Sequence, residues 1–495
     1  MQLREILQHV PTLKIEGPLD REVTGIAYDS RRVGPGIIFV AIRGQNMDGH
    51  QFISNAIDRG AAAIVCETNG FIPRRATKIK VSDSREALSR LAANFHGQPS
   101  AKLKVIGITG TNGKTTVAFM IKHMLETSGM MAGLIGTVRY EIGDRVIPAQ
   151  RTTPEALEVQ QMMSQMARAG CQACVMEVSS HALDQKRVHD VQFDVALFTN
   201  LTRDHLDYHG TMEAYYLAKR QLFQGRPAEG KRRAAVINID DAFGDRLHRE
   251  TSIEVQLTYG ASEKAVLRVT EMGLGPESTR LVVETPRGRI KCEMNLIGRH
   301  NVYNALAALG AGLALDIPLG KMIRALESMP AVPGRLEAIT RGQPFGVFVD
   351  YAHTDDALRN VLSTLRELTR GRLLVVFGCG GNRDAGKRPA MGRVAAELAD
   401  FSMITSDNPR KESPAAIAAQ VVAGHREARP DGYRVELDRG RAIDEVLRMA
   451  RAGDIVLIAG KGHETYQEFE DTVVPFDDRV CASETLETLG YEVPA

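Results

Sequence analysis

The sequence predicts an α/β protein of three domains, in which the second and third domains are built on parallel sheets covered by helices. The chain has 495 residues, and domains of roughly 100–200 residues suggest about three of them. From residue 104 onward, short apolar runs alternate with helical stretches, which is typical of parallel sheets with helices on their faces. The pattern changes near residues 100 and 334, so we expect domains at 1–100, 101–334 and 335–495.

The composition is that of a globular protein, with 43% apolar and 25% charged residues. The formal net charge of +1 gives no reason to expect nucleic acid or a membrane surface as a partner. No apolar run approaches the roughly 20 residues of a membrane span, and the N-terminus lacks the apolar stretch of a signal peptide. We therefore expect a cytoplasmic protein with no membrane or nucleic-acid partner, acting as a monomer.

The six cysteines are scattered along the chain, and their irregular spacing indicates reduced thiols inside a cell. Cys171 and Cys174 form a C-x-x-C pair. We expect this pair to pack at the entrance of a strand, with a redox motif as the alternative.

The first domain is predicted to contain short strands and two helical stretches. Apolar residues at positions 3, 6, 7 and 10 have the spacing of one helix face. Gly34-Pro35-Gly36 indicates a turn between Asp29-Ser30-Arg31 and the apolar run 37–42. We expect the domain to end in a linker near residues 97–100.

The second domain is predicted to begin with a buried strand over 105–109, a glycine-rich loop and a helix from Lys114 to about residue 128. Two more strands are predicted at 173–179 and 195–200, and Thr153 is expected to cap a helix. Alternation in four segments between 254 and 298 indicates an antiparallel meander, and a packed helix is expected over 301–315.

The third domain has five strand candidates separated by helical stretches, which predicts a Rossmann-like, doubly wound sheet. The candidates lie at 345–349, 373–377, 401–405, 433–437 and 455–459.

A glycine-rich loop, Gly110-Thr111-Asn112-Gly113-Lys114-Thr115-Thr116, lies between the first strand and helix of the second domain. Glycines let backbone N–H groups approach phosphate oxygens, and the helix N-terminus adds a positive dipole. Lys114 would reach the β- and γ-phosphates of a nucleotide, and Thr115 would ligate Mg²⁺. The loop is shorter than the general phosphate-loop pattern, because Ile108 stands where that pattern has glycine. The alternative is a purely structural turn.

Polar side chains follow two further predicted strands of this domain. Glu177 belongs to the end of the first, and His205 follows the second. Open α/β sheets bind ligands at the carboxyl ends of their strands, so both residues are candidate ligands for the divalent metal that ATP chemistry needs. The alternative for each is a capping or supporting role. Lys219, on a helical stretch, is by composition an ordinary solvated lysine.

These motifs resemble those of the Mur ligases, the amide-forming enzymes of peptidoglycan precursor synthesis, and of the related folylpolyglutamate synthetases. The resemblance is carried by Gly110–Thr116, Glu177-Val178-Ser179-Ser180-His181 and Asp204-His205-Leu206-Asp207-Tyr208-His209. It implies that the loop binds ATP and that Lys114, His205 and Lys219 serve catalysis. It also implies Mg²⁺ ligation by Thr115, Glu177, His205 and Lys219, with Lys219 carbamylated so that its ammonium becomes a carboxylate.

Further matches to the family imply where a UDP-MurNAc-peptide and the nucleotide bind. Ser30 and residues 44–49 resemble UDP-binding turns, although Gln45-Asn46-Met47 departs from the His-Gln-Ala-like triplet expected there. The implied contacts of this substrate are Ser30, Gln45, Asn46, Met47, Thr152, Thr153, Ser179, Gln185 and Arg187. Asn301 and Arg335 match contacts of the nucleotide base and ribose, and Asp355 replaces a usual proline, a change we expect to be structural.

The most diagnostic motif is Asp407-Asn408-Pro409-Arg410, which follows a predicted strand. In the family it marks the branch that adds diaminopimelate, and the lysine-adding branch lacks the arginine. Arg410 suits this role, because a guanidinium can bind the distal carboxylate of diaminopimelate in a bidentate pair. Arg383, Gly460 and Glu464 match the remaining amino-acid contacts, with Glu464 facing an ammonium. A plain surface arginine is the alternative for Arg410.

The resemblance therefore implies an ATP-dependent ligase that adds meso-diaminopimelate to the D-glutamyl carboxylate of UDP-MurNAc-L-Ala-D-Glu through an acyl phosphate. Mg²⁺ is the implied cofactor and ATP the co-substrate. One alternative is a folylpolyglutamate-type ligase, against which the first domain and the Asp407–Arg410 motif argue. The other is a phosphate-loop motor or regulator, which would hydrolyse nucleotide without an amine acceptor.

Overall fold

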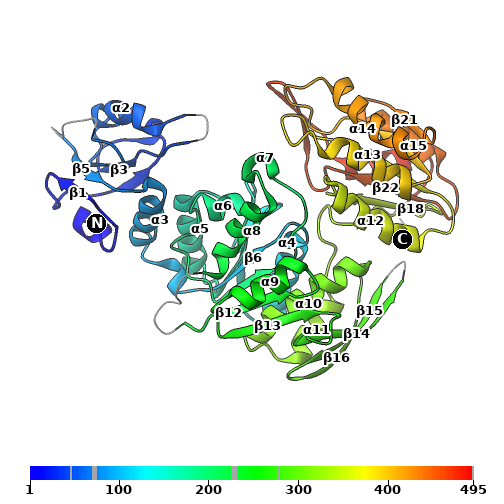
Figure 1. Cartoon of the computed structure of the whole chain (residues 1–495), viewed down its shortest axis with the longest axis horizontal. Helices are drawn as coiled ribbons and strands as arrows, with labels where there is room; N and C mark the ends of the chain where they lie inside the picture. The colour runs from blue at the N-terminus through cyan, green and yellow to red at the C-terminus, as the bar shows by residue number, and fades with distance from the viewer. Residues whose placement is uncertain (45–46, 70–74, 225–230, 276–277, 493–495) are drawn as a thin grey trace.

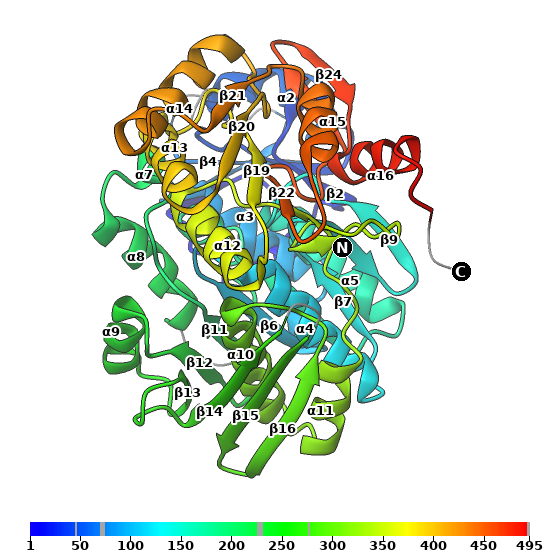
Figure 2. The ribbon, with the colours of Figure 1, turned by 90° about the vertical axis from the view of Figure 1, so that its right-hand side faces the viewer.

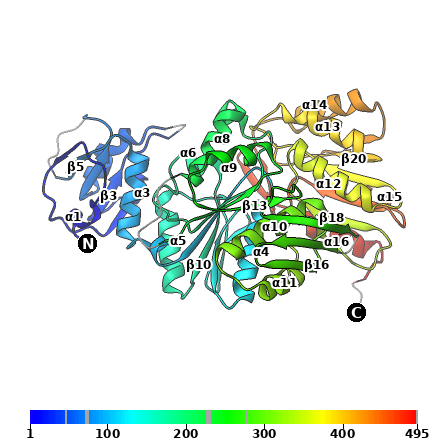
Figure 3. The same cartoon turned by 60° about the horizontal axis from the view of Figure 1, so that its bottom comes forward.

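The computed structural model describes residues 1–44, 47–69, 75–224, 231–275 and 278–492. It contains three large sheets that follow one another along the length of the molecule (Figures 1 and 3). In the described part of the chain, no helix has the length and apolarity needed to cross a membrane. The predicted α/β class with parallel sheets in the middle and C-terminal regions is confirmed.

The N-terminal region is a five-stranded sheet in the order β1-β5-β4-β3-β2, with β1 antiparallel and the other strands parallel. The strands are β1 Lys14–Glu16, β2 Gly25–Ala27, β3 Ile37–Val40, β4 Ala63–Cys66 and β5 Thr77–Lys80. The helices are α1 Leu3–Ile6, α2 Ile53–Asp58 and α3 Ser84–Phe95. The first helix is shorter than its apolar spacing suggests, because His9 adopts a left-handed conformation, yet Val10 is still buried.

The middle region is built on an eleven-stranded sheet in which β6 lies between β10 and β11. Its strands are β6 Lys104–Thr109, β7 Ala132–Ile135, β8 Arg139–Ile142, β9 Arg145–Pro148, β10 Ala173–Glu177, β11 Val195–Phe198, β12 Ala234–Asn238, β13 Val255–Gly260, β14 Leu267–Leu274, β15 Thr279–Thr285 and β16 Gly288–Met294. Its helices are α4 Lys114–Thr127, α5 Ala156–Arg168, α6 Ser180–Asp184, α7 Leu206–His209, α8 Met212–Arg220, α9 Ala242–Glu250, α10 Arg299–Ala314 and α11 Leu319–Glu327.

Two predictions for this region are wrong. The antiparallel meander comprises β14, β15 and β16, whereas β13 pairs in parallel with both β12 and β14. Thr153 does not cap a helix, since α5 begins at Ala156 and the Thr153 hydroxyl donates to the Glu177 carbonyl at 2.8 Å. The hydroxyl also accepts the Ser179 N–H at 3.1 Å, so it joins two segments of the sheet edge instead.

The C-terminal region is a six-stranded sheet in the order β17-β18-β22-β19-β20-β21, in which only β17 is antiparallel. Its strands are β17 Glu337–Ala338, β18 Gly346–Asp350, β19 Leu373–Phe377, β20 Phe401–Ile404, β21 Tyr433–Val435 and β22 Ile455–Ala459, followed by the separate hairpin β23 Tyr466–Phe469 and β24 Thr472–Pro475. Its helices are α12 Asp355–Leu368, α13 Lys387–Leu398, α14 Pro414–Ala428, α15 Arg439–Met449 and α16 Asp478–Thr488. All five predicted strands are present, and α12 faces the middle region (Figure 2).

Candidate functional site

The glycine-rich loop joins β6 to α4 with a backbone that only glycine can adopt. Gly110 has φ 145°, and a Cβ added there would lie 1.9 Å from the Thr199 hydroxyl. Gly113 has φ 85°, and its Cβ would lie 2.4 Å from the amide oxygen of Asn304. No side chain caps the following helix, so its first N–H groups and its dipole are directed at the space in front of the loop. This is the geometry of a phosphate site.

Two lysines converge on this loop, Lys114 with a partly buried and Lys219 with a buried side chain. Lys114 donates to the carbonyl oxygens of Gly110 at 3.0 Å and Thr111 at 2.7 Å. Lys219, only 2% exposed, donates to the same Gly110 carbonyl at 2.7 Å. Burial lowers the pKa of the Lys114 ammonium, although Glu177 and Asp204 oppose the effect. Burial and then the neighbouring Lys114 hold the pKa of Lys219 well below its ordinary value.

A carboxylate and two hydroxyls meet beside the loop. Thr115 donates to the Glu177 carboxylate at 3.0 Å, and Thr137 donates to it through its N–H at 2.8 Å and its hydroxyl at 3.0 Å. A buried carboxylate next to a threonine hydroxyl is the oxygen donor set that Mg²⁺ prefers. In the described part of the chain, however, no group of three or more His, Cys, Asp or Glu side chains is arranged to hold a metal ion.

His205 lies at the start of α7 in a left-handed conformation, with φ 53°. Its Nε2 is 3.4 Å from the Asp204 carboxylate, and its ring is 4.9 Å from the ring of His181, centroid to centroid. Burial lowers the pKa of His205 to about 3, so the imidazole is neutral near pH 7 and can act as a metal ligand or hydrogen-bond partner.

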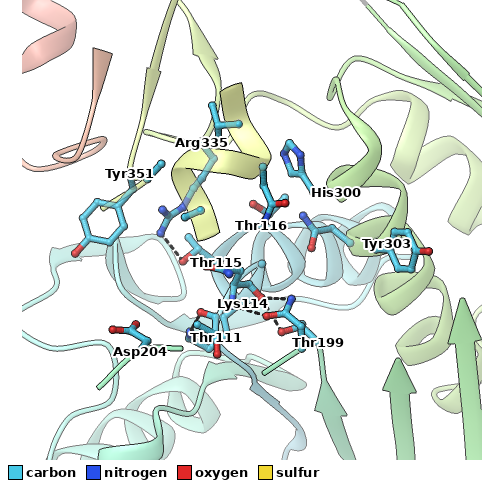
Figure 4. A pocket seen from close by; sticks show the side chains of 18 of the residues that line it. Thr111, Lys114, Thr115, Thr116, Thr199, Asp204, His300, Tyr303, Arg335 and Tyr351 are labelled. Carbon is cyan, nitrogen blue, oxygen red and sulfur yellow. Dashed lines mark hydrogen bonds between the residues drawn. The ribbon is translucent and has the colours of Figure 1, made fainter. Parts of the chain in front are cut away.

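These groups line one cavity of about 530 Å³ that extends from the loop to α10 and α12 (Figure 4). Arg335 enters it from the C-terminal side, donating to the Thr115 hydroxyl at 3.0 Å, and its guanidinium lies 4.6 Å above the Tyr351 ring. The cavity thus brings together many residues singled out from the sequence. These are Thr111, Asn112, Gly113, Lys114, Thr115, Thr116, Thr152, Glu177, Ser179, His205, Lys219, Asn301 and Arg335.

Two cavity residues that were not singled out from the sequence are Thr137 and Tyr215. Asp356 was not singled out either, and it contacts the loop beside the cavity. Asp356, in the first turn of α12, accepts from the Asn112 side chain at 2.7 Å and from the Thr202 hydroxyl at 3.1 Å. These contacts attach the C-terminal region to the phosphate loop. The sequence alone does not predict this contact, because Asp356 and Asn112 are 244 residues apart.

A second cluster surrounds Arg187 at the end of the sheet nearer the N-terminal region. The Arg187 guanidinium donates to the Thr153 carbonyl at 2.9 Å and to the Gln185 side chain at 2.7 Å. Thr153 in turn contacts Ser179, as described above. Ser30 and the exposed Met47 lie in the N-terminal region and do not line the 530 Å³ cavity, and Gln45 and Asn46 are outside the described residues.

The third cluster is formed by two loops of the C-terminal region, which follow β20 and β22. The Asn408 amide donates to the Glu464 carboxylate at 2.9 Å. Lys461, fully buried, donates to both of them, at 3.1 Å and 2.9 Å. Gly460 has φ 112°, and a Cβ there would lie 2.8 Å from the Asp407 carboxylate. The loops are thus interlocked through side chains, and Lys461 was not singled out from the sequence.

Arg410 projects from this cluster with a partly exposed side chain. Its guanidinium donates to the Gly381 carbonyl at 2.9 Å and lies 2.9 Å from the Glu468 carboxylate. Arg383, on the same loop as Gly381, is exposed. Residues Arg383, Asp407, Asn408, Pro409, Arg410, Gly460 and Glu464 all lie outside the 530 Å³ cavity.

Family comparisons cover most of the chain. Residues 22–96 match the Mur ligase family catalytic domain, residues 108–312 the Mur ligase middle domain, and residues 334–462 the Mur ligase glutamate ligase domain.

Similar full-length proteins carry one printed name, UDP-N-acetylmuramoyl-L-alanyl-D-glutamate--2,6-diaminopimelate ligase. The protein from Syntrophomonas wolfei is 44% identical, with 98% of this chain and 99% of that protein aligned. The protein from Solibacter usitatus is 46% identical, with 99% of each chain aligned. A solved structure of the same name is similar at a TM-score of 0.71 and 32% identity, covering 99% of both chains. The chain therefore belongs to the Mur ligase family.

Proposed function

We propose that this chain is an ATP-dependent ligase that joins meso-diaminopimelate to the D-glutamyl carboxylate of UDP-MurNAc-L-Ala-D-Glu. The observation that carries the proposal is the position of Arg410, whose guanidinium is held in the loop that follows β20 of the C-terminal sheet. The same chain has a glycine-rich loop before α4 in its middle region, with the geometry of a phosphate site. The relatives at 44% and 46% identity, which bear the name of this activity, support it. We further propose the three domains at 1–100, 101–334 and 335–495.

In the first step, a glutamyl carboxylate oxygen attacks the γ-phosphorus of ATP, the bond to ADP breaks, and an acyl phosphate forms. The phosphates are surrounded by loop residues, namely Gly110, Thr111, Asn112, Gly113 and Thr116. Lys114 stabilises the negative charge that develops on the phosphates during transfer of the γ-phosphoryl group. Asn301 and Arg335 contact the nucleoside. The contact of Asp356 with Asn112 keeps the C-terminal region next to this nucleotide.

Thr115 and Glu177 fit Mg²⁺, with His205 and Lys219 as further ligands in the same cavity. When bound, the ion would offset negative charge on the phosphates. Lys219 fits this set after carbamylation: its deprotonated amine adds to the carbon of CO₂, one C=O π bond opens onto oxygen, the nitrogen loses a proton, and the side chain then ends in a carboxylate. The lowered pKa of the buried Lys219 side chain favours the deprotonated amine that this reaction needs.

In the second step, an amine of diaminopimelate attacks the acyl carbon, a tetrahedral intermediate forms, and phosphate leaves. Arg410 pairs with the distal carboxylate, with Arg383 nearby, and Glu464 contacts an ammonium. Asp407, Asn408, Pro409 and Gly460 shape the loops that hold this substrate. UDP-MurNAc-dipeptide contacts Ser30, Gln45, Asn46, Met47, Thr152, Thr153, Ser179, Gln185 and Arg187.

The proposal is tested by measuring phosphate release and the ligated product while each substrate is omitted in turn. We expect one phosphate per amide, and neither product unless ATP, UDP-MurNAc-dipeptide and meso-diaminopimelate are all present. Phosphate release without an amine acceptor would favour a motor or regulator. Addition of glutamate to a folate would favour the folylpolyglutamate-type activity.

A further inference from the structure

Residues 467–470 of the β23–β24 hairpin form hydrogen bonds with the Asp407–Arg410 loop. The Arg410 N–H donates to the Glu468 carbonyl at 3.0 Å, and the Glu470 N–H donates to the Arg410 carbonyl at 2.7 Å. The Gln467 amide donates to the Asp407 carbonyl at 2.9 Å, and the Glu468 N–H donates to the Asn408 side chain at 3.1 Å. The backbone of Arg410 is therefore fixed from the hairpin, in a left-handed conformation with φ 52°.

The Arg410 side chain is held from two sides. On one side, the Gly381 carbonyl accepts from Nη1 at 2.9 Å. On the other, the Glu468 carboxylate lies 2.9 Å from Nε, with 34% of the Glu468 side chain and 22% of the Arg410 side chain exposed. Gly381 lies in a loop and Glu468 on strand β23, so together they orient the plane of the guanidinium.

We propose that Glu468 is a positioning residue that orients Arg410 and thereby sets the preference for an amine that carries a second carboxylate. The proposal deepens the proposed function and rests on it. A planar guanidinium forms a bidentate pair only in a limited range of orientations, so an arginine free to rotate loses both affinity and discrimination.

Glu468 also has an opposing effect, because its negative charge repels a substrate carboxylate. Its side chain is about one third exposed, and solvent weakens interactions between charges at such positions. The orienting contact is direct, at 2.9 Å, whereas the substrate carboxylate would bind Arg410 away from Glu468. We therefore expect loss of Glu468 to weaken diaminopimelate binding.

The test is steady-state kinetics of Glu468→Ala, Glu468→Gln and the matched control Glu470→Ala with meso-diaminopimelate and L-lysine. Glu470 is an exposed carboxylate two positions away, and its contact with Arg410 uses only its backbone. For Glu468→Ala we expect KM for diaminopimelate to rise about tenfold, with kcat within about twofold and lysine kinetics unchanged. Glu468→Gln keeps an acceptor oxygen, so its KM should rise at most about threefold, and Glu470→Ala should match the wild type.

The same truncation in an Arg410→Ala background separates positioning from general loop damage. If Glu468 acts through Arg410, then adding Glu468→Ala to Arg410→Ala should leave kcat/KM for diaminopimelate unchanged. An equal loss in both backgrounds, an equal loss with both amines, or a lower KM for diaminopimelate would overturn the inference. Glu468→Thr, which suits a strand, replaces the alanine variant if that one fails to fold.

The experiments distinguish failure of the proposed function from failure of the role of Glu468. If the wild type forms no amide with diaminopimelate, the proposed function fails before any variant is made. If the wild type prefers diaminopimelate and Glu468→Ala behaves like the Glu470→Ala control, only the role of Glu468 is wrong.

Discussion

The phosphate loop of the middle region and the Asp407–Arg410 loop of the C-terminal region are built in different ways. The first uses backbone: Gly110 and Gly113 adopt conformations closed to other residues, and Lys114 and the buried Lys219 donate to its carbonyl oxygens. The second uses side chains: Asn408, Glu464 and Lys461 interlock, and Glu468 contacts Arg410 at the surface.

The difference matches the two tasks that we propose for these loops, nucleotide binding and amino-acid recognition. Every ligase that uses ATP binds the same triphosphate group, so a rigid backbone loop can bind it. An amino-acid substrate must be distinguished from close analogues that lack one charged group. This discrimination needs a charged side chain whose orientation is set by its neighbours. Side-chain clusters of this sort can be altered by one substitution without disturbing the sheet beneath. We expect substitutions at the first site to lower activity strongly with every amine, and substitutions at the second site to have smaller effects that depend on the amine.

The largest effect is expected for Lys114→Ala. A cation at a transferring phosphoryl group contributes about 10³- to 10⁵-fold in rate, and we expect kcat to fall within this range for every amine tested. Circular dichroism and the melting temperature should show an intact fold, since removal of the Lys114 cation leaves Glu177 with its Thr115 and Thr137 donors. Near-normal turnover by the folded variant would refute the phosphate-loop assignment.

Next in size is the effect of Arg439→Met on the stability of the C-terminal region. Arg439 and Asp478 form a fully buried ion pair, and Arg439 also donates to the carbonyls of Ser406 and Ala459, where the loops that carry Arg410 and Glu464 begin. Leaving Asp478 unpaired should cost about 3–5 kcal/mol, measured by calorimetry of the C-terminal transition. Replacing both partners with Met and Leu should recover most of it. A loss below about 1 kcal/mol in the single variant would contradict the assignment of this pair as the anchor of the loops.

A smaller loss, about 10²- to 10³-fold in kcat, is expected for Lys219→Ala, because it removes one group that stabilises charge at the phosphates. Short carboxylic acids should restore part of the activity by replacing the carbamate. In the wild type, ¹³C-labelled bicarbonate should give a carbamate signal that is absent from the variant. A bare ammonium in an active, metal-bound crystal supplied with bicarbonate would contradict the carbamylation.

The sequence predicted the backbone-built site better than the side-chain-built one. Strand, glycines, lysine and helix are consecutive, so local rules suffice to place Lys114 and Thr115 beside a helix N-terminus. Thr153 shows the limit of such rules, since its predicted capping role was displaced by hydrogen bonds to Glu177 and Ser179, partners on the neighbouring strand end. The parallel pairing of β13 was equally hidden, because alternation of side chains does not reveal the direction of the partner strand.

The side-chain clusters depend on contacts between distant segments. The Asp407–Arg410 motif could be singled out by its family resemblance, but Glu468 and Lys461 have no signal of their own in one sequence. Each is one charged residue on a loop or hairpin until the fold places it against Arg410 or Asn408. The link between Asp356 and Asn112 across 244 residues is of the same kind.

The most direct test of the account is the ratio of kcat/KM for meso-diaminopimelate to that for L-lysine, measured in the wild type and in Arg410→Ala. The wild type should strongly prefer diaminopimelate, and the substitution should lower this selectivity by about 2–5 kcal/mol, because a charge-assisted pair to the distal carboxylate is lost. Kinetics with lysine should change little. An equal loss for both amines would show that Arg410 only supports its loop, and efficient use of lysine by the wild type would contradict the proposed substrate.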